Sequence, residues 1–393
     1  MKKNQFVKLA VIGVAASVFP LVGAGQAFGD YAPQPNDIVG VGGDTPQYAV
    51  DFALNGAPTT GAAGFDQDAT VNRVVSFLAT PDANGRSAYT NSVSTGAAST
   101  GLDPTDVLRA GTTATPRVSS SGAAISALLA DTGTTENINF ISSASEPTSG
   151  NQTTAANNGW GYLHTVEIGT DSVQIVADTT TNAPTGLSIA ELLGIYNGTY
   201  TTWNALPDNG SGSTATILPE IPPSGSSIYK TFIADLTTAN GGTAPTLAGD
   251  VKTVEQNDPT TVTGSSSPAN AIVPFSSGRL NLFNNGYFKN SGQTTTWGLP
   301  SSFTSISPGV KFLNGATPDS GTAYDSPITD YIIFRESDAT STTPLEPGGT
   351  KNWVQTLFSD PGGTAPYFDK AAGQALLAAA GITPIYNDLG DVN

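Results

Sequence analysis

The sequence has no cysteine among its 393 residues, and it has a single histidine and a single methionine. Without cysteine the protein can form no disulfide bond, no thiolate metal site and no lipid-modified N-terminal cysteine. The one histidine, His164, excludes a metal site made of several histidines. We interpret it as an ordinary polar residue at a strand edge, because a catalytic triad would need serine and aspartate partners that the sequence cannot locate. No Walker or dinucleotide motif is present either, so we expect no catalysis, no metal and no cofactor.

Charged residues are scarce too, at 12% of the chain, and the acidic ones outnumber the basic ones by 32 to 15. Nucleic acids and anionic membrane surfaces both bind to basic patches, which a net charge of −17 disfavours. Neither is therefore expected as a partner. An anion site in such a chain has to depend on local dipoles, because the overall charge weakens the long-range attraction of anions.

Long apolar runs are absent beyond the N-terminus. Lysines precede an apolar run over residues 9–22 and small residues follow it, which is the pattern of a cleaved secretory signal over residues 1–29. The alternative is a retained membrane anchor, but Pro20 interrupts the run and no later stretch approaches the ~20 apolar residues needed to span a bilayer. The mature protein should start near Asp30 and be secreted, either into a periplasm or out of the cell.

Glycine and proline are plentiful, at 44 and 27 residues, so long turn-rich loops should separate modest helices and strands. A hydrophobic content of 38% in periodic segments indicates an ordered chain, and its length allows two α/β domains with full cores. Apolar runs predict strands in segments 38–41, 71–78, 138–141, 163–177 (as two runs), 271–275 and 331–334. Helical spacing predicts helices that begin near residues 45, 121, 189, 227 and 368, with stops at Gly56, Gly133, Asn197 and Gly381. This alternation favours mainly parallel sheets.

Three turns that share one design precede predicted helices, at residues 42–45, 119–122 and 224–227. Each presents unpaired backbone N–H groups at a helix start, the positive end of the helix dipole and small side chains that admit close approach. Serine and threonine are also ordinary helix caps, which is the alternative for each turn taken alone. The recurrence favours a site for a small anion. In the first turn, Thr45 suits the N-cap position, and Asp44 either caps the helix or accepts a hydrogen bond from a protonated ligand.

Five sequence runs follow one another in the order IVGVGGDTPQY, RVSSSGAAISALL, NINFISSASEP, SIAELLGIYNGTYTTW and PPSGSSIYKTF. In order and spacing they resemble the phosphate-binding subunit of bacterial phosphate ABC transporters, and most of all its secreted relatives in high-GC Gram-positive bacteria. The resemblance covers nearly the whole mature chain. It implies a type II periplasmic-binding-protein fold, in which two α/β lobes are joined by two crossing strands and hold the ligand in the cleft between them.

The resemblance also implies which residues contact the ligand. They lie in the three turns and after the strand at 138–141: Thr45, Ser120 and Ser121 beside Gly122, Ser143 or Ser145, and Ser224, Gly225 and Ser226. Two positions depart from the family pattern. Ala144 or Ser145 stands where the family has an aspartate that accepts the phosphate proton, and Glu220 stands where it has an arginine. The nearest cations in sequence are Arg117, Lys230 and Arg279, and each is either a replacement for that arginine or a solvated surface charge.

We predict an exported, monomeric solute-binding protein that captures a small tetrahedral oxyanion, above all phosphate, and works with an ABC transporter permease. The alternative is a secreted or surface-associated protein that uses the same fold for adhesion, scavenging or display, with altered or lost ligand binding. The predicted division places residues 30–168 and 271–393 in one lobe and 169–270 in the other, with hinge bending near 166–172 and 268–275.

Overall fold

The structure, a computed structural model, describes residues 33–57, 60–67, 72–79, 105–133, 136–285, 287 and 307–392. The predicted signal at residues 1–29 lies outside these ranges. No helix within them combines the length and the apolar character that a membrane span requires.

The strands of the described ranges form one ten-stranded sheet and a separate β3–β4 pair. Their bounds are β1 Ile38–Gly42, β2 Val74–Ser76, β3 Thr105–Asp106, β4 Thr115–Pro116, β5 Phe140–Ser143, β6 Leu163–Asp178, β7 Leu218–Ile221, β8 Lys252–Thr253, β9 Ala271–Ser276, β10 Val310–Phe312, β11 Asp325–Arg335 and β12 Thr383–Gly390. The order across the large sheet is β2-β1-β5-β11-β6-β9-β7-β8, and β10 and β12 both pair with β6.

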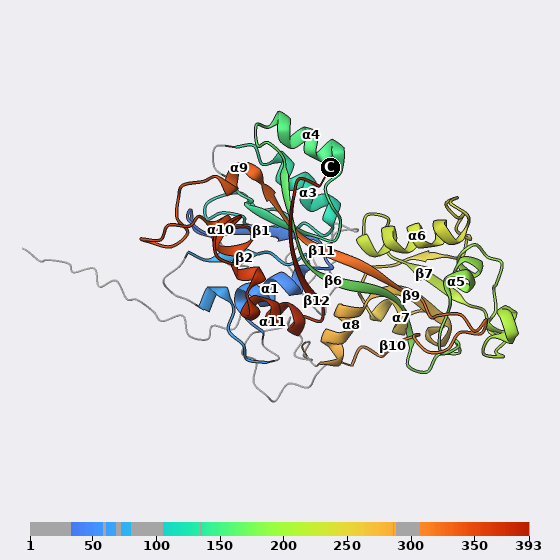
Figure 1. The fold of residues 1–393 in the computed structure, drawn as a ribbon. Coiled ribbons are helices and arrows are strands. Elements are labelled where there is room, and N and C mark those ends of the chain that lie inside the picture. The colour runs from blue at the N-terminus through green and yellow to red at the C-terminus, as the bar shows by residue number, and fades with distance from the viewer. Residues whose placement is uncertain are drawn as a thin grey trace, which may run out of the picture.

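Helices pack against both faces of this sheet. Their bounds are α1 Gln47–Asn55, α3 Ser121–Ala130, α4 Ser149–Asn157, α5 Ile189–Tyr196, α6 Ser227–Ala239, α7 Thr260–Thr263, α8 Ser277–Asn284, α9 Glu336–Ala339, α10 Trp353–Leu357 and α11 Ala371–Ala379. Figure 1 shows two lobes, one with α1, α3, α4 and α9 to α11 (lobe 1) and one with α5, α6 and β7 (lobe 2).

Two long strands cross from one lobe to the other (Figure 1). The segment predicted as two runs is the single 16-residue strand β6. Its partner β11 runs antiparallel to it from Arg335 beside Leu163 to Asp325 beside Gln174, with a register shift between Asp330 and Tyr331. Strand β9 pairs with β6 only over the lobe 2 half, so β11 rather than segment 268–275 is the second strand that spans both lobes.

The sheet is mixed, so the prediction of mainly parallel sheets is wrong. Strand β1 runs parallel to β2 and β5, and β7 runs parallel to β8 and β9. Strand β6 is antiparallel to β9, β10, β11 and β12, and β11 is antiparallel to β5. The βα units within each lobe produce the parallel pairs, whereas the strands that connect the lobes run in the opposite sense.

The apolar core follows both faces of the sheet. In lobe 2, β6 and β9 pack against α5 and α6, and Leu313, Tyr324 and Ile328 join this core although the sequence division assigns them to the other lobe. In lobe 1, one face packs against α3, and the opposite face packs against α1, α10 and α11 and continues through α8 to α7. The outer limits of the predicted lobes otherwise stay a prediction.

Local signals at the helix starts are mostly confirmed. Ser120, Ser188 and Ser226 are the N-caps of α3, α5 and α6, and each side chain accepts a hydrogen bond from a backbone N–H of the first turn. At α1 the prediction is wrong by one residue, because Pro46 rather than Thr45 occupies the N-cap position. Helix α3 ends at Ala130, before the predicted stop at residue 133. Helices α4 and α8 and strand β12 were not predicted.

Candidate functional site

The three predicted turns meet where the two lobes face each other. Thr45 at the start of α1 and Ser227 at the start of α6 share a hydrogen bond of 3.0 Å between their side-chain oxygens. The α1 turn also touches the start of α3, because a Cβ on Gly43 would lie 2.9 Å from the backbone nitrogen of Ser121. Three helix N-termini, two from lobe 1 and one from lobe 2, therefore converge on one place.

In the second turn, the hydroxyl groups of Ser120 and Ser121 accept hydrogen bonds from different segments. The Ser120 hydroxyl accepts a hydrogen bond from the backbone N–H of Ala123 at 3.3 Å and so caps α3. The Ser121 hydroxyl accepts from the backbone N–H of Ala144 at 2.9 Å and ties the turn to the segment after β5. Within the described ranges the Ser121 hydroxyl donates to no acceptor, so its proton is available to a bound anion.

The segment after β5 uses its own hydroxyl locally. The Ser143 side chain is fully buried and donates to the carbonyl of Ser145 at 2.6 Å, while it accepts from the Ser145 backbone N–H at 3.1 Å. Ser143 consequently has no hydroxyl proton left to donate to a ligand. Ser145 is half-buried, and its role stays a prediction.

In the third turn the buried Ser226 side chain accepts from the backbone N–H of Tyr229 at 3.0 Å, whereas Ser224 and Gly225 are exposed. Ser227, which makes the contact to Thr45, was not among the predicted residues. The signal for it was present, since it is the next hydroxyl in the same run of small residues.

Asp44 was predicted to cap the helix or to accept a hydrogen bond from a protonated ligand. Instead, it joins three segments of the protein. Its carboxylate accepts hydrogen bonds from Gln47 at 2.5 Å and from Asn257 at 2.5 Å. It also forms an ion pair of 3.0 Å with Arg279 of α8, whose guanidinium lies 4.6 Å from the centre of the Tyr48 ring. Both members of the ion pair are buried, so neither Asp44 nor Arg279 is left for a ligand.

Arg117 is not the replacement cation either. Its side chain is 1% exposed and forms an ion pair of 2.7 Å with buried Asp106. The same guanidinium donates to the carbonyls of Leu78 at 3.0 Å and Thr105 at 3.3 Å. These partners hold β3 and β4 against β2, and Arg117 therefore belongs to the framework of lobe 1.

Lys230 is the third cation that the sequence suggested. It is exposed on α6, and its Nζ would lie 3.8 Å from a Cβ on Gly122, so it reaches across from lobe 2 to the start of α3. It forms no ion pair with any residue that the structure describes. Glu220, in contrast, is buried, burial raises its pKa to about 7, and its partner is Lys252 at 3.4 Å.

A comparison with protein-family models matches residues 79–326, more than half of the chain, to the PBP superfamily domain. The chain belongs to the PBP superfamily. This is a superfamily of substrate-binding receptors and not an enzyme family. Comparison of the sequence with curated proteins finds no match.

Solved structures similar to this PBP superfamily member include an ABC-type phosphate transport receptor from Vibrio cholerae, at 14% identity and a TM-score of 0.45, covering 89% of this chain and 100% of that one. A phosphate ABC transporter substrate-binding protein from Clostridium perfringens, with bound phosphate, has 12% identity and a TM-score of 0.44, covering 89% and 99%. A human phosphate-binding apolipoprotein has 18% identity and a TM-score of 0.45, covering 88% and 91%.

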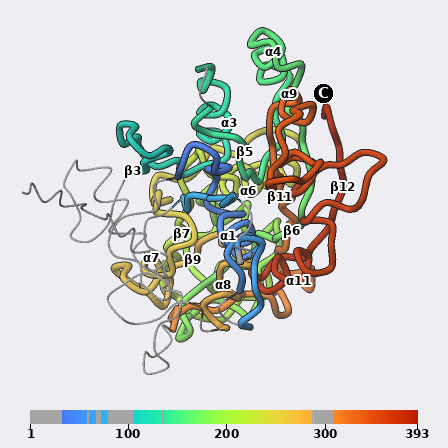
Figure 2. Tube along the Cα trace, turned by 90° about the vertical axis from the view of Figure 1, so that its left-hand side faces the viewer, coloured from blue at the N-terminus to red at the C-terminus, as the bar shows by residue number. Residues whose placement is uncertain are grey.

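His164 occupies an unexpected place in this PBP fold. Its Nδ1 lies 2.6 Å from Glu336 and its Nε2 lies 2.6 Å from Asp388 of β12, which also accepts from the Ser359 hydroxyl at 2.5 Å. Its ring stacks on Phe334 with 4.7 Å between centres. Burial lowers the pKa of His164, but the hydrogen bonds to the two carboxylates raise it more, and the net shift is upward. The cluster joins the C-terminal strand β12 to β6 and to the start of α9. In Figure 2, β12 lies on the opposite side of the molecule from β3.

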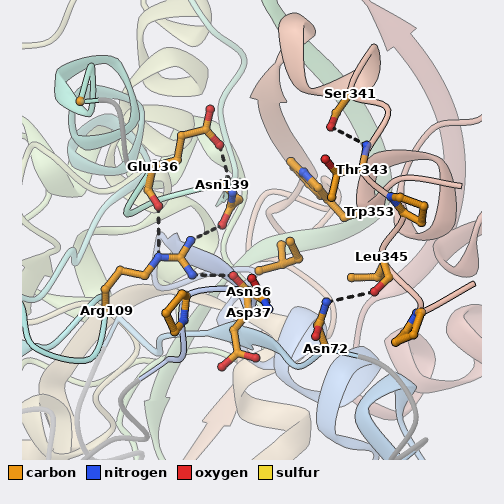
Figure 3. A pocket seen from close by; sticks show the side chains of 15 residues that line it. Asn36, Asp37, Asn72, Arg109, Glu136, Asn139, Ser341, Thr343, Leu345 and Trp353 are labelled. Carbon is orange, nitrogen blue, oxygen red and sulfur yellow. Dashed lines mark hydrogen bonds between the residues drawn. The ribbon is translucent and has the colours of Figure 1, made fainter.

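A cavity of about 550 Å³ lies in lobe 1 at the amino ends of β1 and β5 (Figure 3). Arg109 inside it donates to the carbonyls of Asp37 at 2.5 Å and Glu136 at 3.1 Å and to Asn139 Oδ1 at 2.8 Å. The turn at 42–45 follows the carboxyl end of β1, and Ala144, which is bonded to Ser121 of the second turn, follows the carboxyl end of β5. The cavity is therefore separate from the candidate site, and its cation is fully engaged by the protein.

Proposed function

We propose that this PBP superfamily member is an extracytoplasmic solute-binding protein that captures a small tetrahedral oxyanion, above all phosphate, for ABC-type uptake. The observation that carries the proposal is the convergence of three helix N-termini from two lobes, at Thr45, Ser121 and Ser227. Helix N-termini present backbone N–H groups and a partial positive charge to an anion. A tetrahedral oxyanion can take hydrogen bonds from three directions at once.

The donors at this junction are neutral, apart from Lys230. Each charge-assisted hydrogen bond to an anion contributes about 1.5 to 3 kcal/mol, so several of them hold an oxyanion without a buried cation. Lys230 adds a formal charge beside the start of α3. In water, two unit charges about 4 Å apart interact by about 1 kcal/mol, which corresponds to a several-fold change in affinity.

Cellular placement follows from the N-terminus. We propose that residues 1–29 are a cleaved secretory signal and that the mature protein works outside the cytoplasm, in a periplasm or extracellularly, as a monomer. A transporter permease is its expected partner, and catalysis is not part of its role.

Calorimetry on phosphate-stripped protein tests the proposal, with phosphate, arsenate, a phosphonate and sulfate as titrants. Ser121→Ala should weaken phosphate binding roughly ten- to a hundredfold, because it removes one charge-assisted hydrogen bond. Lys230→Gln should weaken it by about fivefold and reduce its salt dependence. Lys311→Gln is the matched control, since Lys311 is another exposed lysine and lies on β10. Absence of heat and of thermal stabilisation with every titrant would remove the proposal.

A further inference from the structure

The segment after β8, residues 255–258 (the β8 loop), lies beside the third turn. Strand β8 runs parallel to β7, with Thr253 beside Ile221, and the backbone N–H of Val254 donates to the carbonyl of Ile221 at 2.9 Å. The third turn follows β7, and the β8 loop follows β8. Because neighbouring parallel strands end at the same edge of a sheet, both segments leave lobe 2 on the side of the candidate site.

Two consecutive side chains of the β8 loop reach two turns of lobe 1. Gln256 Nε2 donates to the carbonyl of Ser119 in the second turn at 3.4 Å. Asn257 Nδ2 donates to the carboxylate of Asp44 in the first turn at 2.5 Å. The Asn257 bond is shorter and its acceptor is charged, so it is the stronger of these two contacts between the lobes.

The Asn257 side chain is held in one orientation. It is buried, and its Oδ1 accepts from the backbone N–H of Ser276 at 2.9 Å, which leaves the amide N–H groups directed to Asp44. Its backbone has a φ of 56°, a left-handed conformation that asparagine adopts more readily than most other residues with a side chain. Uncommon backbone conformations of this kind occur preferentially at functional sites.

The other partners of Asp44 do not replace this contact. Gln47 and Arg279 contact Oδ1 of the carboxylate, whereas Asn257 donates to Oδ2. Gln47 belongs to α1 and therefore moves together with Asp44. Without the Asn257 amide, Asp44 would keep its ion pair with Arg279 and would not become an unpaired buried charge. The fold should consequently tolerate the loss of the Asn257 side chain.

We propose that Asn257 is a positioning residue of the anion site, which holds the first turn of lobe 1 against lobe 2 in the closed molecule. This inference rests on the proposed function. Asn257 acts through Asp44, whose neighbour Thr45 stands at the start of α1 and bonds to Ser227 of lobe 2. Because the Asn257–Asp44 bond joins two lobes, it forms as they close and breaks as they open.

The consequence concerns the rate at which the ligand leaves. An anion enters the open molecule, where the Asn257–Asp44 bond is absent, so this bond should not change the association rate. It stabilises the closed molecule and should slow dissociation. A hydrogen bond to a charged group corresponds to about ten- to a hundredfold in the closing equilibrium.

Asn257→Gly in the full chain tests the inference, because glycine adopts the same backbone conformation and the change removes only the side chain. Calorimetry on phosphate-stripped protein should give a phosphate Kd raised at least about tenfold. Release of labelled phosphate into an excess of unlabelled phosphate should be faster by about the same factor. The association rate, obtained from the two values, should change by less than about threefold.

Two further variants support the comparison. Asn209→Gly is the matched control, since Asn209 is an exposed asparagine between α5 and β7 with a φ of 64°. It should leave the Kd and the release rate unchanged. Asn257→Asp keeps the shape and the acceptor for Ser276 but places a second carboxylate against Asp44, so it should weaken binding more than Asn257→Gly does.

Hydrogen exchange in the parent protein gives a test that needs no variant. In this proposal the β8 loop does not contact the ligand, so its protection reports the contact with Asp44. Saturating phosphate should raise the protection of the β8 loop together with that of the first turn. Unchanged protection of the β8 loop, with binding proven by calorimetry, would overturn the role of Asn257.

The outcomes distinguish this inference from the proposed function. A parent protein that binds none of the oxyanions overturns both. A parent that binds phosphate, with Asn257→Gly and Asn257→Asp that lose stability but keep its Kd and release rate, overturns only the positioning role. A loss of affinity that lies entirely in slower association also overturns it, because the bond would then act before the lobes close.

Discussion

Replacing His164 by glutamine should loosen the C-terminal strand and remove a pH dependence of stability. In the parent protein both ring nitrogens face carboxylates, at 2.6 Å from Glu336 and 2.6 Å from Asp388. Only the imidazolium can donate to both at once. The neutral amide of glutamine can satisfy at most one of them, and it leaves two carboxylates near each other.

The magnitude follows from burial. The His164 side chain is 7% exposed, but Glu336 and Asp388 are 28% and 26% exposed, so solvent screens part of the interaction. Breaking a fully buried ion pair costs about 3 to 5 kcal/mol and an exposed pair less than about 1 kcal/mol. We expect a loss of about 2 kcal/mol in the free energy of unfolding, where the imidazolium is fully formed.

The sign with pH is fixed by the direction of the shifts. Because the folded pKa of His164 is raised above its ordinary value of 6.5, the stabilisation is complete below pH 6.5 and is lost as pH rises through the folded pKa. The slope in between is about 1.4 kcal/mol per pH unit. Burial raises the pKa of Asp388, but hydrogen bonds from His164 and Ser359 lower it more, so its contribution is lost only at acid pH, as the pH falls through a folded pKa below 3.8.

Urea unfolding at several pH values between about 5 and 9 measures this, with hydrogen exchange of the β12 amides as a local probe. The difference between His164→Gln and the parent should be largest near pH 5.5 and should shrink toward pH 9. Asn387→Ala is the control, because Asn387 joins the same two strands through a hydrogen bond of 2.5 Å to Glu167, and its amide does not titrate. A His164→Gln deficit of equal size at pH 5.5 and pH 9 would refute the reasoning.

Three further predictions concern the framework of the lobes. Arg117→Gln should lower the free energy of unfolding by about 3 to 5 kcal/mol, because it leaves Asp106 buried without its ion pair, and calorimetry should find phosphate affinity unchanged. Gly42→Ala should cost about 1 to 3 kcal/mol in chemical unfolding, since the added Cβ would lie 1.8 Å from Ser142 Oγ, and Ser142→Ala in the same chain should recover part of the loss. Small-angle scattering should give a smaller radius with saturating phosphate, by bending of β6 and β11 near their register shift, and an identical profile with proven binding would contradict the hinge.

The parts that the sequence predicts well depend on short-range rules. Ser120, Ser188 and Ser226 cap their helices because a hydroxyl three residues before a free N–H is a local arrangement. The convergence of the three turns was also predictable, through the resemblance and the common design of the turns. Ser227 was not predicted, because the resemblance implied only Ser224, Gly225 and Ser226 of the same run.

The parts that it predicts poorly depend on distant partners. Asp44 and Arg279 are 235 residues apart, and no spacing rule connects them. In the sequence Arg117 cannot be distinguished from a solvated surface cation, because its ion pair with Asp106 becomes visible only in the folded structure. The direction of the crossing strands is likewise a property of the whole sheet.

Asp330 on β11 is a buried carboxylic acid that the sequence pattern indicates. Ile328, Asp330 and Ile332 alternate along β11, and all three are buried. An aspartate in the apolar phase of a strand predicts a buried carboxyl group, although the sequence cannot say what it faces.

The strand β6 has a consequence for how the protein melts. Val166 and Ile168 belong to the core of lobe 1, whereas Val173 and Ile175 belong to the core of lobe 2, and one uninterrupted strand carries all four. Neither half of the chain would keep a complete sheet if the other unfolded. Although the molecule has two lobes, we therefore expect both to unfold in a single calorimetric transition. A fragment that contains only one lobe should fail to fold alone.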